Sequence, residues 1–286
     1  MMTSSILNPL DFIPRIPIGN WVDDIIQALR TAIGPLTRVI STILSGFMGV
    51  LSDLLLLIPP FILILIISAV AWKLASQRVA VFSFIGLSLI YNIGLWEESI
   101  ITITMILVAV FISLLIGIPT GILSTRYDMV HKIVWPILDF MQTMPAFVYL
   151  IPAIFFFRLG VVSAMIATVV FSVPPVIRLT GLGIRLVPED MVEAATAFGT
   201  TDWQKLTKVQ LPLAMPTIMA GVNQCIMLAL SMVVIAAMIG AGGLGAVVLR
   251  GIQRVDLGLG FEGGVSVVIL AIILDRITQR TKDAKE

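Results

Sequence analysis

The sequence predicts an all-α protein that crosses a membrane several times as a helical bundle. Of its 286 residues, 58% are hydrophobic and only 12% are charged, whereas a soluble domain averages about 25% charged residues. The apolar residues also gather in stretches of roughly the 20 residues that a spanning helix needs. These observations favour a polytopic membrane protein over a globular enzyme with an anchor. The single cysteine, Cys225, excludes a disulfide framework or a cysteine metal cluster.

Residues 1–53 precede the first expected span and carry apolar residues at helical spacing, for example from Ile25 to Phe47. Two interpretations stay open here: an amphipathic helix in the membrane interface, or a helix that packs on its own protein. Gly34 and Pro35 are expected to break or kink this helix. We therefore divide the chain into an exterior tail with an amphipathic helix, 1–53, and a transmembrane domain, 54–286.

The transmembrane domain contains about seven candidate spans, of which the second is short and the seventh is weak. An odd number of spans places the two termini on opposite sides of the membrane. The candidates are residues 54–72, 79–95, 99–123, 133–157, 161–180, 213–240 and about 259–277.

Lysine and arginine counts orient these spans, because cytoplasmic loops carry an excess of both residues. With the N-terminus outside and the C-terminus inside, 12 of the 18 basic residues fall inside and 6 outside. Residues 181–212 then form a cytoplasmic loop. The inside set is Lys73, Arg78, Arg126, Lys132, Arg178, Arg185, Lys205, Lys208, Arg276, Arg280, Lys282 and Lys285, and the outside set is Arg15, Arg30, Arg38, Arg158, Arg250 and Arg254.

The expected spans hold few groups that could relay a proton. Asp139 is the only acid well inside one of them, and the only histidine, His131, lies in a loop. Proton-coupled transporters usually place such groups within the membrane, although sodium can be coordinated by backbone carbonyls without an acid. Motifs for phosphate binding, metal binding or nucleophilic catalysis do not occur. We expect no active site, no metal and no cofactor in this chain, and we interpret the glycine-rich run 240–245 as a tight outer turn.

Prolines and amides within the spans are the candidates for a solute path. A proline frees a backbone carbonyl that lipid cannot satisfy, so Pro145, with Gln142 close before it, and Pro174 are expected to face protein or water. Asn223 and Gln224 form a polar pair in the sixth span. Such a pair either bonds across helices or lines a pathway, and both interpretations stay open.

The longest polar stretch between apolar blocks, 188–212, predicts two short capped helices. Pro188 suits a first helical position, and Gly199 can take the left-handed conformation that ends a helix. Thr201 and Gln204 then have the spacing of a capping box, and the proline at the end of the stretch is expected to mark the next break. A rigid helix–turn–helix on the cytoplasmic side predicts a surface where another protein docks.

This stretch resembles the EAA motif of ABC importer permeases. The pattern E-A-A-x3-G-x9-[IV]-x-L-P is complete between Glu193 and Pro212. A triplet E-A-A alone would carry little weight in an alanine-rich chain, but the full spacing in a loop placed by charge counting is a strong match. The resemblance implies that ATPase coupling residues are Glu193, Ala194, Ala195, Gly199, Leu211 and Pro212.

From about Gly94 onward the chain resembles more closely the glycine betaine and proline permeases of osmoprotectant importers. Segments that begin at Met141, Pro174, Val209 and Ala271 carry this resemblance. It implies a type I ABC importer permease fold in the cell (inner) membrane of a bacterium or archaeon. It also implies a second permease copy, expected as a homodimer, two cytoplasmic ATP-binding subunits that hold ATP and Mg, and an external substrate-binding protein. Lipid surrounds the chain, and no nucleic acid partner is expected.

In that family the EAA helix seats in a cleft of the ATPase and transmits its closure. Here the helix is expected to move as a unit, with Pro212 separating it from the sixth span. The expected function is import of glycine betaine, proline or a related quaternary amine. One alternative is a permease of the same architecture for another amino acid such as methionine, and another is a secondary transporter driven by an ion gradient.

Overall fold

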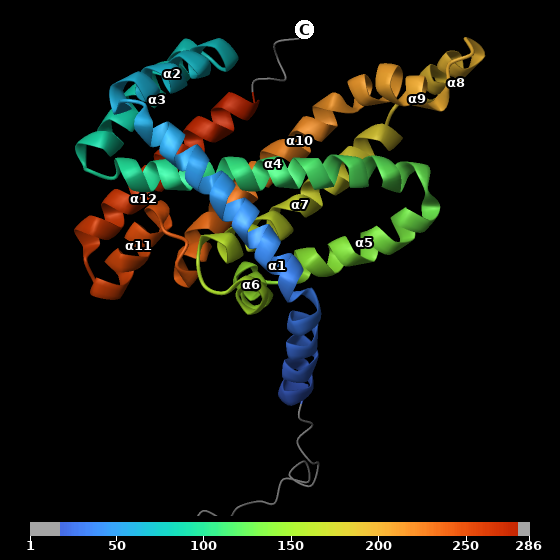
Figure 1. The fold of residues 1–286 in the computed structure, drawn as a ribbon. Helices are drawn as coiled ribbons and strands as arrows, with labels where there is room; N and C mark the ends of the chain where they lie inside the picture. Colours follow the sequence, from blue (N-terminus) through green and yellow to red (C-terminus); the bar gives the residue numbers. More distant parts are fainter. Residues whose placement is uncertain (1–17, 280–286) are drawn as a thin grey trace, which may run out of the picture.

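A computed structural model of the chain describes residues 18–279. The first part of the expected tail, 1–17 with Arg15, and the basic residues Arg280, Lys282 and Lys285 lie outside the described residues. The part described is helical and contains no strand. Its α-helices (Figure 1) are α1 (Ile18–Leu57), α2 (Pro60–Leu74), α3 (Gln77–Asn92), α4 (Trp96–Arg126), α5 (Asp128–Thr143), α6 (Leu150–Phe157), α7 (Val161–Arg185), α8 (Glu189–Ala197), α9 (Asp202–Lys205), α10 (Leu211–Ala236), α11 (Gly243–Arg254) and α12 (Leu257–Gln279).

Helices α4, α7 and α10 form the centre of the bundle, and glycines allow them to approach closely. A Cβ at Gly117 of α4 would lie 2.7 Å from a side-chain atom of Val176 on α7. On α10, a Cβ at Gly221 would lie 3.1 Å from the backbone oxygen of Pro175. Membrane helices associate through such small residues because lipid offers no hydrophobic force between them. The packing of α7 between α4 and α10 therefore depends on these glycines.

Replacing Gly121 of α4 with alanine is expected to loosen this packing. The added Cβ would lie 2.6 Å from Cβ of Thr180 and 2.8 Å from the backbone oxygen of Ile177. Overpacking of this kind costs about 1–3 kcal/mol, so the midpoint of thermal unfolding should fall by about 2–10 °C. The matched control is Gly264→Ala on α12, where a Cβ meets nothing within 4 Å. Equal midpoints for the two variants would contradict the packing described.

Within residues 18–279, five helices are long and apolar enough to cross a membrane, or up to six if one bent pair counts as a span. Seven were expected. The third, fifth, sixth and seventh expected spans lie in α4, α7, α10 and α12. The first, 54–72, is wrong as a single helix, because the chain breaks after Leu57 and α2 begins at Pro60. Helices α2 and α3 have 15 and 16 residues, which at 1.5 Å per residue is less than the roughly 30 Å of a bilayer core.

The fourth expected span, 133–157, is also wrong as a straight helix. It consists of α5 and the segment 146–157, which bend by 115° about a short break. Pro145 lies at this break and disfavours a helical conformation of the residue before it. Accordingly Met144 is extended, with ψ 135°. Apolar composition predicted the segment correctly, but composition carries no information about direction.

Helix α1 runs through Pro35 without a break, and Figure 1 shows it changing direction along its length. The expected kink is present, and the expected break is not. Only 6% of its most apolar window is buried, although the helix is long enough to count as a span. Its middle lies beside Arg158, just before α7, and Leu55 packs on the cluster that contains Trp96, the first residue of α4. Both contacts are at the end of the bundle where α4 and α7 begin.

The glycine-rich run 240–245 is more than the expected turn. Gly240 and Gly242 have φ of 85° and 78° and form a turn, but α11 begins at Gly243. The backbone N–H of Leu244 donates to Oγ1 of Thr102 on α4, at 2.9 Å. Glycine has a low helix propensity, so local sequence does not predict α11, whereas its contacts with α4 and α12 stabilise it.

Candidate functional site: a helix–turn–helix at one end of the bundle

The polar stretch folds as a helix–turn–helix that projects from one end of the bundle (Figure 1). Gly199 has φ 78° and ends α8 as predicted. The N–H of Thr200 then donates to the backbone oxygen of Ala195, at 3.2 Å. Pro188 lies one residue before the first helical position that was expected for it, because α8 begins at Glu189. The turn between α8 and α9 is thus fixed by the glycine and by backbone hydrogen bonds.

The predicted capping box is confirmed at the start of α9. The backbone N–H of Gln204 donates to Oγ1 of Thr201 at 3.3 Å, and the N–H of Thr201 donates to Oε1 of Gln204 at 3.0 Å. These two bonds satisfy N–H groups that a helix start leaves free. The unit is therefore defined at both sides of its turn by local sequence.

The expected break at Pro212 is wrong. Helix α9 continues through a π-helical turn, Leu206–Gln210, into α10, and 202–239 forms one helical run. Proline has no N–H to donate and clashes with the preceding turn of a regular helix. Pro212 is the second residue of α10, and the π-helical turn lies directly before this helix and widens it there. The helix–turn–helix is consequently joined to α10 by continuous helix.

A small apolar cluster seats the unit on the bundle. Leu206 is only 3% exposed and packs with Ile184 of α7 and Ala214 of α10. Val192 of α8 and Leu211 of α10 pack against the same cluster. Leu211 is therefore half-buried at this contact, where it holds α10 against the unit.

The predicted coupling residues differ in how far they are exposed. Glu193, Ala194, Gly199 and Pro212 are exposed, and Ala195 is buried. Glu193 also lines a cavity of about 370 Å³ beside α8. The other residues that line it are Thr125, Arg126, Ile184, Arg185, Val187, Glu189, Val192, Leu206 and Gln210.

Two aromatic residues of the unit were not predicted. Phe198, directly before Gly199, is 88% exposed, and Trp203 in α9 is 66% exposed. Large apolar side chains grouped on a projecting turn are typical of protein interaction sites. The signal in the sequence was an aromatic residue beside the helix-ending glycine of an otherwise polar loop.

The five residues predicted for the solute path line none of four cavities of about 240 to 570 Å³ found among the described residues. Gln142 and Pro145 are exposed at the break between α5 and α6, whereas Pro174 is buried within α7. Asn223 of α10 is half-buried, and its Oδ1 has no hydrogen-bond partner, while Gln224 is exposed. Asn223 is thus the member of this set with a free acceptor inside the protein.

Asp139 is paired in the structure. Its carboxylate accepts a hydrogen bond from Arg178 of α7. The guanidinium groups of Arg178 and Arg185 lie 6.0 and 5.8 Å from the ring centre of Trp135, within the range of a cation–π interaction. This acid links α5 to α7, so its charge is balanced by a fixed partner.

Residues 117–280 match the family model described as binding-protein-dependent transport system inner membrane component. The chain is 47% identical to the glycine betaine transport system permease protein OpuAB of Bacillus subtilis (strain 168), over 97% of this chain and 98% of that protein. It is 48% identical to the glycine betaine/carnitine transport permease protein GbuB of Listeria monocytogenes serotype 1/2a (strain 10403S), over 93% of this chain and 96% of that protein.

A solved structure supports the fold. One chain of the MetNI methionine ABC transporter, in an inward-facing conformation, superposes with a TM-score of 0.58 at 22% identity. The match covers 65% of this chain and 94% of that chain. At this level of identity the likeness concerns the arrangement of the helices.

Proposed function

The chain belongs to the family of binding-protein-dependent transport system inner membrane components, and we propose that it is the membrane-spanning subunit of an ATP-driven importer of glycine betaine. The observation that supports glycine betaine as the substrate is the sequence identity of 47% and 48% to permeases named for glycine betaine, over more than nine-tenths of the chain. Membership of the family makes it a multi-pass membrane protein and a transport subunit, with ATP-binding and substrate-binding partners. The proposed complex contains two copies of this chain and two ATP-binding subunits.

The helix–turn–helix is the proposed docking site for the ATP-binding subunit. Its exposed residues include Glu193, Ala194 and the turn at Gly199. Small alanine side chains allow close approach of a partner, and the exposed ring of Phe198 offers it an apolar anchor. The charge count supports a cytoplasmic position for this end of the molecule. Arg126 and Asp202, which fall on that side, lie 3.8 Å apart.

Movement of the unit would pass directly into α10. Because α9 continues through the π-helical turn, a rotation of α8 and α9 tilts α10 without an intervening hinge. The contact between Gly221 of α10 and Pro175 of α7 then carries the movement to the centre of the bundle. In this mechanism Leu211 holds the joint together, and Pro212 sets the position of the π-helical turn.

The solute path is proposed to use Gln142, Pro145, Pro174, Asn223 and Gln224. Glycine betaine carries a carboxylate and a trimethylammonium group, so it needs donors at one end and carbonyls or rings at the other. Amide N–H groups can donate to the carboxylate, and carbonyls freed by proline can face the cation. A second copy of the chain would complete this path.

Competition for uptake tests the proposed substrate. Proteoliposomes would contain the permease with its ATP-binding subunit and internal ATP, and the substrate-binding protein would be added outside with labelled glycine betaine. Excess unlabelled glycine betaine should abolish uptake of label, and the same excess of methionine should leave it unchanged. Absence of uptake of labelled glycine betaine, together with uptake of labelled methionine under the same conditions, would favour the alternative of an amino acid permease.

A further inference from the structure

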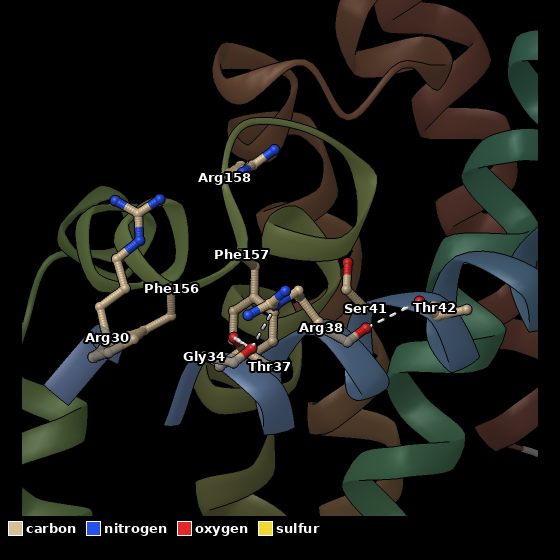
Figure 2. Close-up of a pocket in the computed structure, with 9 residues that line it drawn as sticks. All are labelled: Arg30, Gly34, Thr37, Arg38, Ser41, Thr42, Phe156, Phe157 and Arg158. Atoms are coloured by element: carbon tan, nitrogen blue, oxygen red, sulfur yellow. Dashed lines mark hydrogen bonds between the residues drawn. The ribbon is translucent and has the colours of Figure 1, made fainter. Parts of the chain in front are cut away.

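A large cavity lies where α1 passes the end of α6 (Figure 2). Its volume is about 570 Å³. Three arginines, three hydroxyl side chains and two aromatic rings line it, and no aspartate or glutamate is among the lining residues. These residues are Arg30, Gly34, Thr37, Arg38, Ser41 and Thr42 of α1, and Phe156, Phe157 and Arg158 at the end of α6.

Within residues 18–279, the three arginines have no acidic partner. Among the ion pairs found within residues 18–279, none includes Arg30, Arg38 or Arg158. Arg38 donates from Nε to the backbone oxygen of Gly34 at 3.3 Å. The other N–H groups of this guanidinium do not take part in that bond. Figure 2 shows the three side chains arranged around one space, two from α1 and one from the loop after α6. A guanidinium stays charged and carries five donors, so an anion in this space would relieve their mutual repulsion.

The backbone at Arg158 is held in a conformation that suits glycine. Its φ is 65° and its ψ is −179°, a region that residues with a Cβ rarely adopt. Its N–H donates to the backbone oxygen of Ile154 at 2.8 Å, and its carbonyl accepts a hydrogen bond from Ser163. The N–H of Gly160 donates to the backbone oxygen of Ile239 at 2.9 Å. An arginine kept at this strained position indicates that its side chain has a function there.

The surroundings of the cavity indicate a membrane surface. The side of α1 that carries Ile33, Leu36, Val39 and Ile43 is exposed in the single chain, and we take this apolar side to contact lipid. Arg158 lies just before α7, at the end of the bundle opposite the helix–turn–helix that follows α7. Arginine side chains that face lipid extend to the level of the headgroups, because the hydrocarbon core excludes their charge.

We propose that this cavity binds the phosphate of an anionic phospholipid headgroup, with the acyl chains along the exposed apolar side of α1. Guanidinium groups bind phosphate with two parallel hydrogen bonds each. The rings of Phe156 and Phe157 and the apolar residues of α1 give the site an apolar surface beside the three arginines. Free phosphate has no apolar part that could contact these residues. An acidic surface of the substrate-binding protein would likewise leave them without an apolar partner.

Native mass spectrometry of the purified complex tests the proposal. The permease with its ATP-binding subunit would be mixed with equal amounts of phosphatidylglycerol and phosphatidylcholine, and bound lipid would be counted for each variant. Wild type should retain phosphatidylglycerol in preference. The double variant Arg30→Gln, Arg38→Gln should retain about tenfold less of it, because charge-assisted bonds to phosphate are lost. Arg254→Gln is the matched control, an exposed arginine that does not line the cavity, and should retain lipid as wild type does.

Arg158→Gly separates binding from folding. The change removes the guanidinium and also relieves the positive φ, so the variant should unfold at the same temperature as wild type or higher while it retains less phosphatidylglycerol. Unchanged retention in this variant and in the double variant would overturn the proposal. Displacement of the lipid by millimolar inorganic phosphate would show a general anion site instead. Weaker binding of the substrate-binding protein with lipid retention intact would show a protein docking site.

Discussion

Replacing Gly199 with valine is expected to abolish ATP-driven uptake while the permease remains inserted and folded. Gly199 has φ 78°, and a β-branched residue is strongly disfavoured there, at a cost of about 1–2 kcal/mol or more. The turn would open, and α8 would lose its alignment with α9. A docking surface placed wrongly by this turn cannot transmit closure of the ATP-binding subunit, so uptake should fall at least about tenfold. The measurement is uptake of labelled glycine betaine per molecule of inserted permease.

The same position provides the control. Asparagine tolerates positive φ better than other residues with a Cβ, so Gly199→Asn should retain much more uptake than Gly199→Val. A wild-type rate in the valine variant would show that the turn does not need the left-handed conformation. Equal loss in both variants would show that the side chain, rather than the backbone, causes the defect.

Replacing Phe198 with alanine is expected to weaken binding of the ATP-binding subunit. The ring is 88% exposed in the isolated chain, so it contributes little to the stability of the permease itself. Aromatic anchors at the centre of an interface contribute about 2 kcal/mol or more, which corresponds to roughly 30-fold in Kd. The measurement is the Kd between the purified permease variant and its ATP-binding subunit.

Tyr127 offers the comparison for this prediction. It lies at the end of α4, on the same end of the bundle, is 57% exposed and does not belong to the helix–turn–helix. Tyr127→Ala should change the Kd less than about threefold, and thermal unfolding of both variants alone should match wild type. An unchanged Kd for Phe198→Ala would place the docking surface away from this turn.

The parts of the site that sequence predicted correctly are those fixed by neighbouring residues. The stop at Gly199 and the capping box of Thr201 and Gln204 each involve residues a few positions apart, so their chemistry can be read directly. The break predicted at Pro212 was wrong because the helix widens into a π-helical turn directly before it and continues. A proline signal therefore indicates local adjustment and does not by itself specify a break.

Composition predicted which segments are apolar helices better than it predicted how these helices are arranged. Hydropathy located α4, α7, α10 and α12, because each contains a long apolar run. It could not show the direction that the chain takes after the break at Pro145, nor that the glycine-rich segment continues into α11, since both depend on packing between helices. The solute path stayed a set of candidates for the same reason, because such a path is formed by helices that are distant in sequence.

For helix α1, too, the sequence predicted the element but not its contacts with distant residues. Its apolar spacing predicted a helix, and its exposed apolar residues fit the interpretation of a helix in the membrane interface. The alignment of Arg30 and Arg38 with Arg158 could not be predicted, because 120 residues and more separate them in the chain. Only the folded structure places these charges around one cavity.

The central claim is that ATP hydrolysis by a partner subunit drives the solute through this chain. Its most direct test is to measure ATP hydrolysis and glycine betaine uptake in the same proteoliposomes, with the substrate-binding protein outside. We predict that hydrolysis rises when the loaded binding protein is added and that uptake stops when ATP is omitted. Uptake that continues without ATP, driven by a sodium or proton gradient, would contradict the claim and favour a secondary transporter.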